Sequence, residues 1–227
     1  MQVSIVRLSL FLINKNLIQN NPIQFMKKLA LVLLAGFSFA TSHAQFAFGI
    51  KGGANISNVN GSGVSGTNSL VGFNAGVFLK LPVTSHLAIQ PELFYSGQGF
   101  KVSSGGITTS EHENYINIPV LLKAHFAGVF IETGPQAGFL VTAKANTQGV
   151  SFDNKSSFNS ADFSWVFGAG VKIPMTPISL DARYNFGLSN IINNSGNNSS
   201  GGSGNGTVHN GSFQIGIMIN LFSAPIR

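Results

Sequence analysis

The chain has 227 residues, of which only 9% are charged and none is cysteine. Typical soluble domains contain roughly 25% charged residues, so this composition fits an ordinary soluble domain poorly. The absence of cysteine excludes disulfides, cysteine metal sites and thiol catalysis.

The formal charge of +6 overstates the basic character of the protein. Four of the 13 Lys and Arg residues lie in a predicted leader, namely Arg7, Lys15, Lys27 and Lys28. From Gln45 onward, nine Lys and Arg stand against seven Asp and Glu, a net charge of +2. We therefore expect no nucleic-acid partner, because such a partner requires a strong basic surplus.

Residues 1–44 are predicted to be a signal peptide, followed by one domain at 45–227. Met26-Lys27-Lys28 is a basic start, Leu29 to Phe39 is apolar, and Ser42-His43-Ala44 provides small residues at a cleavage site. The apolar run is about a dozen residues, too short to cross a bilayer as a helix. Met26 is the expected true start, and the alternative is that the upstream residues form an extended basic region.

The remaining chain alternates large apolar residues with small or polar ones. From Phe163 to Ile173, the odd positions are apolar and the even positions include Gly168, Gly170 and Lys172. Such alternation is typical of a β-strand with two unlike faces. The predicted strands cover residues 45–56, 69–81, 87–100, 114–126, 129–143, 162–173, 178–189 and 212–222.

The connections alternate in length. Short turns at 82–86, 127–128 and 174–177 alternate with long loops at 57–68, 101–113, 144–161 and 190–211, the last rich in Asn, Ser and Gly. Outer-membrane barrels have short periplasmic turns, long external loops, an apolar outside and a polar inside. We therefore predict an all-β fold, an eight-stranded antiparallel up-and-down transmembrane barrel. Both mature termini should be periplasmic, and the 190–211 loop should be mobile.

Charged residues fall on the predicted inward faces. The bore of such a barrel is just wide enough for its own side chains, so we expect these charges to neutralise one another in a closed lumen. A two-residue turn at Ala127-Gly128 sets Lys123 opposite Glu132, and a turn on Thr176-Pro177 sets Lys172 opposite Asp181. The alternative is an ion path or a substrate site. The complete inward set is Lys51, Lys80, Glu92, Lys123, Glu132, Lys172, Asp181 and Arg183.

Two groups near the external rim could carry chemistry. Glu111-His112-Glu113 places a histidine between carboxylates, but neighbouring residues of an extended chain point in different directions, so a solvated loop is favoured over a metal site. His209 and Asp162 could join a rim serine in a hydrolase triad, but nothing in the sequence fixes their geometry. We expect no catalytic residues, cofactor or metal.

Aromatic residues on the outward faces suit the membrane interface. An interfacial belt is predicted from Tyr95, Phe163, Trp165 and Tyr184. Phe222 ends the last strand and could be recognised by barrel-assembly machinery. The expected partners are therefore outer-membrane lipid and, during biogenesis, that machinery.

Several stretches carry a family resemblance across nearly the whole mature chain. They are FGIKGG at 48–53, LAIQPEL at 87–93, YINIPVLLK at 115–123, ETGPQAG at 132–138, DARYNFGLSN at 181–190 and the closing strand. They resemble the outer-membrane β-barrel domain family that includes the PorT-like proteins. The resemblance implies an eight-stranded barrel in the outer membrane of a Gram-negative cell. It also implies that most relatives lack an assigned activity, while PorT-like members are linked to protein secretion.

The sequence thus predicts a non-enzymatic integral outer-membrane protein with a closed polar lumen and mobile external loops. Two alternatives stay open, a component associated with a secretion apparatus and a narrow small-solute channel. A surface ligand is possible in chemical terms, but the sequence does not identify one.

Overall fold

The computed structural model describes residues 46–61, 67–104, 106–192 and 208–223. The predicted signal peptide and the centre of the 190–211 loop lie outside these residues. No helix within the described ranges is long and apolar enough to cross a membrane.

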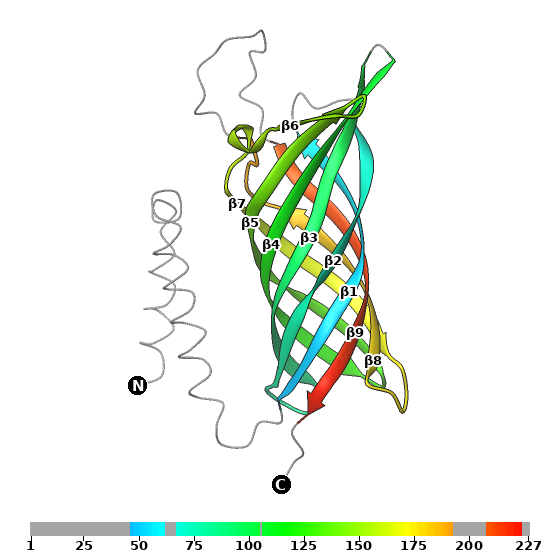
Figure 1. Ribbon diagram of the computed structural model, residues 1–227. Helices are drawn as coiled ribbons and strands as arrows, with labels where there is room; N and C mark the ends of the chain where they lie inside the picture. The colour runs from blue at the N-terminus through cyan, green and yellow to red at the C-terminus, as the bar shows by residue number, and fades with distance from the viewer. Residues whose placement is uncertain (1–45, 62–66, 105, 193–207, 224–227) are drawn as a thin grey trace, which may run out of the picture. The chain divides into compact units, whose positions relative to one another are not determined.

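The described strands form one antiparallel sheet that closes on itself (Figure 1). Eight strands make the ring in the order β4-β3-β2-β1-β9-β8-β7-β5, and pairing of β4 with β5 closes it. The short strand β6 pairs only with β5 among the described residues. The elements are β1 (Ala47–Gly61), β2 (Thr67–Pro82), β3 (Leu87–Ser104), β4 (Ile107–Phe126), β5 (Val129–Thr147), β6 (Val150–Asp153), η1 (Lys155–Ser157), β7 (Ala161–Lys172), β8 (Ile178–Gly187) and β9 (Val208–Ser223).

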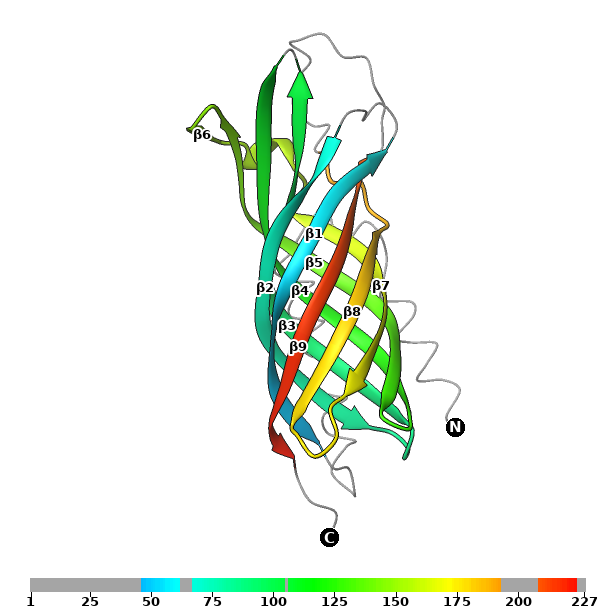
Figure 2. The ribbon, with the colours of Figure 1, turned by 90° about the vertical axis from the view of Figure 1, so that its right-hand side faces the viewer.

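The predicted eight-stranded up-and-down barrel is confirmed. Neighbours along the chain are neighbours in the ring, and the strands are tilted around the barrel axis (Figure 2). Ala47 pairs with Ser223, so the ring begins and ends at the same end of the barrel. We call this the turn end, since it also contains the three short connections, and we call the opposite end the loop end.

The two faces of the strands differ as the alternation predicts. Phe73 is 59% exposed, whereas the next residue, Asn74, is 2% exposed. Ile215 is 56% exposed beside Gln214 at 3%. Large apolar side chains therefore cover the outside, which is the reverse of a water-soluble barrel, and the lumen contains many polar side chains together with smaller buried apolar clusters.

Most strands extend further at the loop end than predicted, although β8 ends at Gly187, two residues before its predicted end. The segment 101–113, expected to be a loop, continues β3 and β4 as a hairpin that rises beyond its neighbours (Figure 1). Hydroxyl pairs stabilise these polar extensions, with 3.0 Å between Ser103 and Thr108 and 2.8 Å between Thr109 and Thr147. Apolar alternation marks only the lipid-facing part of a strand, so the prediction ended where the polar pairs begin.

Glycine allows the backbones of β1 and β9 to approach each other. Gly53 lies opposite Gly216, and a Cβ atom on Gly53 would overlap the backbone carbonyl of Ile215. We expect Gly53→Ala to lower the free energy of unfolding by about 1–3 kcal/mol, because the backbone must move to make room. Urea unfolding in lipid vesicles measures this change.

The neighbouring Gly52 provides the matched control for that substitution. A Cβ atom there would lie 3.7 Å from the carbonyl oxygen of Asn74, which is an ordinary contact. Gly52→Ala should change the free energy of unfolding by less than about 0.5 kcal/mol. Equal effects of the two alanines would contradict the tight approach of β1 and β9.

Candidate functional site in the barrel lumen

Six charged side chains meet in the lumen between the middle of the barrel and the turn end. Each has at most 5% of its surface exposed. Three are cations and three are carboxylates, so the group, here called the charge cluster, is neutral as a whole. Its members are Lys51, Glu92, Lys123, Glu132, Asp181 and Arg183.

Arg183 on β8 is the centre of the charge cluster. Its Nη1 and Nη2 donate to the two carboxylate oxygens of Glu92 at 2.7 and 2.8 Å. Its Nε lies 2.5 Å from Glu132 Oε1 and 2.5 Å from Asp181 Oδ2. One guanidinium therefore forms ion pairs with all three carboxylates, and its planar fork of donors binds Glu92 through two hydrogen bonds.

The two lysines complete the neutralisation. Lys51 Nζ lies 3.0 Å from Glu92 Oε2, and Lys123 Nζ lies 3.0 Å from Glu132 Oε2. Each ammonium also faces an aromatic ring, with 4.4 Å from Lys51 to the centroid of Phe94 and 3.8 Å from Lys123 to that of Phe130. Opposite charges and ring faces together offset the loss of water around the ammonium groups.

The register predictions had different outcomes. Lys123 pairs with Glu132 across the Ala127-Gly128 turn, as predicted. The pairing of Lys172 with Asp181 is wrong, since Lys172 lies opposite Ser179.

The turn between β7 and β8 explains this difference. The backbone amide of Ile173 donates to the carbonyl oxygen of Ile178 at 3.0 Å. The connection therefore has four residues, 174–177, whereas the prediction assumed a two-residue turn. Met175 within it has a positive φ of 61°. The longer turn shifts the register by two residues, so Asp181 lies opposite Gly170 and not opposite Lys172. The carboxylate of Asp181 forms its ion pair with Arg183.

Lys80 and Lys172, the other two members of the predicted inward set, lie outside the charge cluster. Lys80 is half-buried and Lys172 is exposed, both at the turn end. Among the described residues, neither has a carboxylate oxygen within 4.0 Å. The lumen charges therefore divide into a neutral interior group and an unneutralised pair at the mouth.

A layer of amides and hydroxyls lies on the loop-end side of the charge cluster. Asn55 Nδ2 donates to Ser96 Oγ at 2.8 Å, and Asn74 Nδ2 donates to Asn55 Oδ1 at 2.6 Å. Across the lumen, Gln136 Nε2 donates to Ser164 Oγ at 3.1 Å. These short polar side chains fill the bore and bond to one another.

Closer to the loop end, two carboxylates are buried. Glu113 accepts a hydrogen bond from the Tyr115 hydroxyl at 2.9 Å, and Asp162 accepts one from Ser189 Oγ at 2.6 Å. Asn210 Nδ2 lies between them, 3.5 Å from Glu113 and 3.4 Å from Asp162.

The structure brings together the residues considered for a rim triad, but not in triad order. Ser189 Oγ bonds directly to Asp162, while His209 Nδ1 contacts the backbone carbonyl oxygen of Ser189 at 2.8 Å. In a catalytic triad the histidine stands between the hydroxyl and the carboxylate. In this arrangement the Ser189 hydroxyl is bonded to Asp162, and His209 contacts the backbone.

The side chains of the Glu111-His112-Glu113 segment point in different directions, as expected for an extended chain. Glu111 accepts from Asn154, His112 is exposed on the outer face, and Glu113 points into the lumen. No group of three or more potential ligands from His, Cys, Asp or Glu exists in the described part of the chain.

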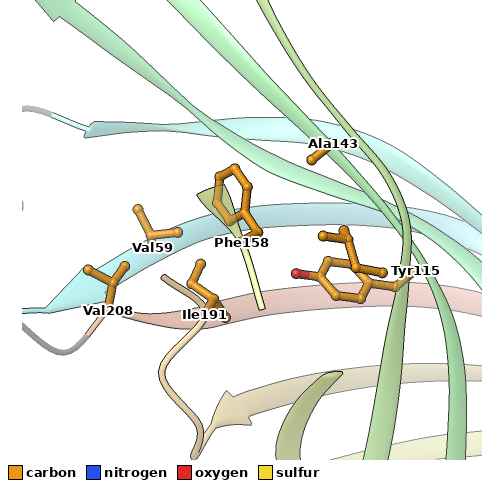
Figure 3. Packing of buried hydrophobic residues seen from close by; sticks show 7 residues of the cluster. Val59, Tyr115, Ala143, Phe158, Ile191 and Val208 are labelled. Atoms are coloured by element: carbon orange, nitrogen blue, oxygen red, sulfur yellow. The ribbon is translucent and has the colours of Figure 1, made fainter. Parts of the chain in front are cut away.

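An apolar cluster lies in the lumen at the loop end (Figure 3). Phe158 and Ile191 come from the segments before β7 and after β8, and they pack against side chains of the barrel wall. The two segments are joined by the Phe158–Ile192 bridge and by a 2.7 Å bond from the Asn159 amide to the Ile191 carbonyl. We call this group the apolar cap; its buried members are Val59, Tyr115, Leu140, Ala143, Phe158, Ile191 and Val208.

Comparison with known proteins identifies the family. Residues 19–193, more than half of the chain, match the family described as outer membrane protein beta-barrel domain. The chain belongs to this family. It is an outer-membrane β-barrel protein, as the sequence resemblance predicts. The PorT-like subtype stays a prediction.

Two bacterial proteins are among the solved structures that match the chain. Neisserial surface protein A has 14% identity and a TM-score of 0.52, covering 77% of this chain and 97% of that chain. Ail, the attachment invasion locus protein of Yersinia pestis, has 17% identity and a TM-score of 0.41, covering 78% of this chain and 98% of that chain. At such low identity, the first likeness shows the fold alone. No curated protein matches the chain.

The predicted interfacial aromatics of this outer-membrane barrel lie on its outer face. Trp165 is 39% exposed and Tyr184 is 44% exposed, while Tyr95 and Phe163 are half-buried. The Tyr95 ring packs 5.4 Å from that of Phe73, and Trp165 Nε1 donates to Thr133 at 2.8 Å. Their role as a belt at the lipid surface stays a prediction.

Sequence reasoning missed two parts of the site. It placed Arg183 and Glu92 inward but did not bring them together, since they are 91 residues apart and are not paired in register. It also missed the apolar cap, because Phe158 and Ile191 lie in segments with no apolar alternation. Residues that meet across the lumen are far apart in the sequence, so no local sequence pattern predicts their contact.

Proposed function

We propose that this outer-membrane barrel is a non-enzymatic protein with a lumen closed to solutes, acting through its loop-end surface. The observation that carries the proposal is the buried, neutral charge cluster, whose six members fill the bore. An ion path would need water or free charges along the lumen, and here the charges bind one another. The apolar cap adds a second barrier at the loop end.

The proposed orientation places the turn end in the periplasm and the loop end outside the cell. The alternation of short turns and long connections supports it, because outer-membrane barrels share this asymmetry. Both ends of the ring, Ala47 and Ser223, then lie on the periplasmic side. The hairpin of β3 and β4 extends to the exterior, where its polar outer face meets water.

The absence of enzymatic activity is proposed on the geometry of the rim. Ser189 Oγ donates to Asp162 and accepts the Phe163 amide at 2.7 Å, so this hydroxyl is held by two partners. A nucleophilic serine needs an adjacent general base, which in a Ser-His-Asp triad is a histidine nitrogen within reach of the hydroxyl. His209 is turned to the backbone instead.

Single-channel recording in planar bilayers tests the closed lumen. The purified protein should give no conductance above that of protein-free bilayers, since no continuous water path is expected through the charge cluster. A porin inserted under the same conditions checks the sensitivity of the recording. Discrete conductance steps from the barrel would reject the closed lumen and favour the narrow-channel alternative. The association with a secretion apparatus stays a prediction from the family resemblance.

A further inference from the structure

The turn end of the lumen contains a small pocket lined by basic groups. Its volume is about 40 Å³, and it lies between the charge cluster and the mouth of the barrel. Lys80 on β2, Lys123 and His125 on β4, and Lys172 on β7 all line it. Four basic side chains from three strands therefore face one space.

This pocket has a surplus of positive charge. Lys123 is neutralised by Glu132 at 3.0 Å, but Lys80 and Lys172 have no carboxylate within 4.0 Å among the described residues. His125 Nε2 is buried and has no hydrogen-bond partner in the described part of the chain. The charge cluster cannot compensate, because its cations and carboxylates already balance. Like charges around one cavity repel, and a bound anion removes that repulsion.

The floor of the pocket fixes the positions of two of these groups. Phe130 contacts Lys123 and His125. Lys123 Nζ lies 3.8 Å from the centroid of the Phe130 ring, and the centroid of the His125 ring lies 5.7 Å from the same point. Phe78, Phe130 and Met218 form a buried apolar cluster at this level. The packing therefore holds donors in place around the pocket before any ligand arrives, which lowers the entropy lost on binding.

We propose that this pocket binds a phosphate group. Ammonium and imidazole donors converge from different strands, and the Ser179 hydroxyl and the Asn220 amide also line the space. A tetrahedral anion with several acceptor oxygens can use donors from many directions, whereas a planar carboxylate uses fewer. The phosphate comes either from free phosphate or from a lipid headgroup, since the pocket opens at the mouth of a membrane barrel. The inference does not depend on whether the lumen is closed.

Titration calorimetry with inorganic phosphate tests the site directly. The full protein, in a maltoside detergent that contains no phosphate, should bind one equivalent saturably. Lys80→Ala/Lys172→Ala should weaken the affinity about tenfold or more, because two charge-assisted contacts are lost. Lys101→Ala/Lys144→Ala removes the same charge at the loop end and should leave the affinity unchanged. Acetate at equal ionic strength should not displace phosphate.

The same variants distinguish the source of the phosphate. Native mass spectrometry with short-chain phosphatidylglycerol should retain one lipid on the wild type and less on Lys80→Ala/Lys172→Ala if the group belongs to a lipid. Binding of inorganic phosphate without lipid retention assigns the site to free phosphate. Heat-modifiable migration on gels checks that each variant is folded, which we expect because neither lysine forms an ion pair with another described residue.

Three results would overturn the proposal. They are no saturable binding of either phosphate source, equal affinity of the wild type and Lys80→Ala/Lys172→Ala, and displacement of phosphate by acetate at equal ionic strength.

Discussion

Arg183→Ala is expected to lower the free energy of unfolding by about 3–5 kcal/mol, the range for removing one partner of a buried ion pair. Arg183 contacts Glu92, Glu132 and Asp181, so its loss leaves three carboxylates close together with only two lysines. The side chain is 2% exposed, and water cannot replace the guanidinium without opening the barrel. Urea unfolding in phospholipid vesicles, followed by the fluorescence of the single Trp, measures the change.

Two further variants provide unfolding free energies with which that of Arg183→Ala is compared. Lys123→Ala should cost less, about 1–3 kcal/mol, because Glu132 keeps its contact with Arg183. Lys144→Ala removes an exposed cation on β5 and should be nearly neutral, within about 0.5 kcal/mol. If Arg183→Ala and Lys144→Ala unfolded at the same urea concentration, the charge cluster would not stabilise the barrel.

The second large effect is expected on the lipid face. Val120→Arg should lower the free energy of unfolding by about 2–4 kcal/mol, the cost of a cation near the bilayer midplane. Val120 lies on the outer face of β4, between the outward-facing Ile118 and Leu122. The same vesicle unfolding measures it, with the fraction of protein that inserts as a second measurement.

His112→Arg is the matched control for this substitution. His112 lies on the same face of the same strand but in the polar extension beyond the apolar band, where it is exposed. Arginine there meets water and should change stability by less than about 0.5 kcal/mol. Tolerance of arginine at both positions would mean that the apolar face does not meet lipid.

The fold could be predicted because the alternation of side chains is a local property. Phe73 beside Asn74, and Ile215 beside Gln214, already separate the two faces in the sequence. A strand with a period of two, repeated with alternating short and long connections, leaves few arrangements other than a closed barrel in lipid. The Lys123–Glu132 pair could also be predicted, since a two-residue turn fixes the register of the strands that it joins.

The register of β7 with β8 and the full lengths of β3 and β4 could not be predicted from local sequence patterns. The four-residue turn after Lys172 shifted the register by two residues, and turn length there is set by backbone conformations such as that of Met175. The polar ends of β3 and β4 form strands because they pair with each other, although they lack apolar alternation.

The sequence by itself determined the class of protein, the direction in which each strand presents its apolar side, and the six charges of the charge cluster as inward-facing, but not the buried Glu113 and Asp162. Only the tertiary structure decided how those charges combine. It placed Arg183 among three carboxylates, left Lys80 and Lys172 around an open pocket, and packed Phe158 and Ile191 over the loop end. The physical reason is that the alternation along a single strand decides whether a side chain faces the lumen. Which side chains meet across the lumen depends on the tilt and stagger of all eight strands of the ring.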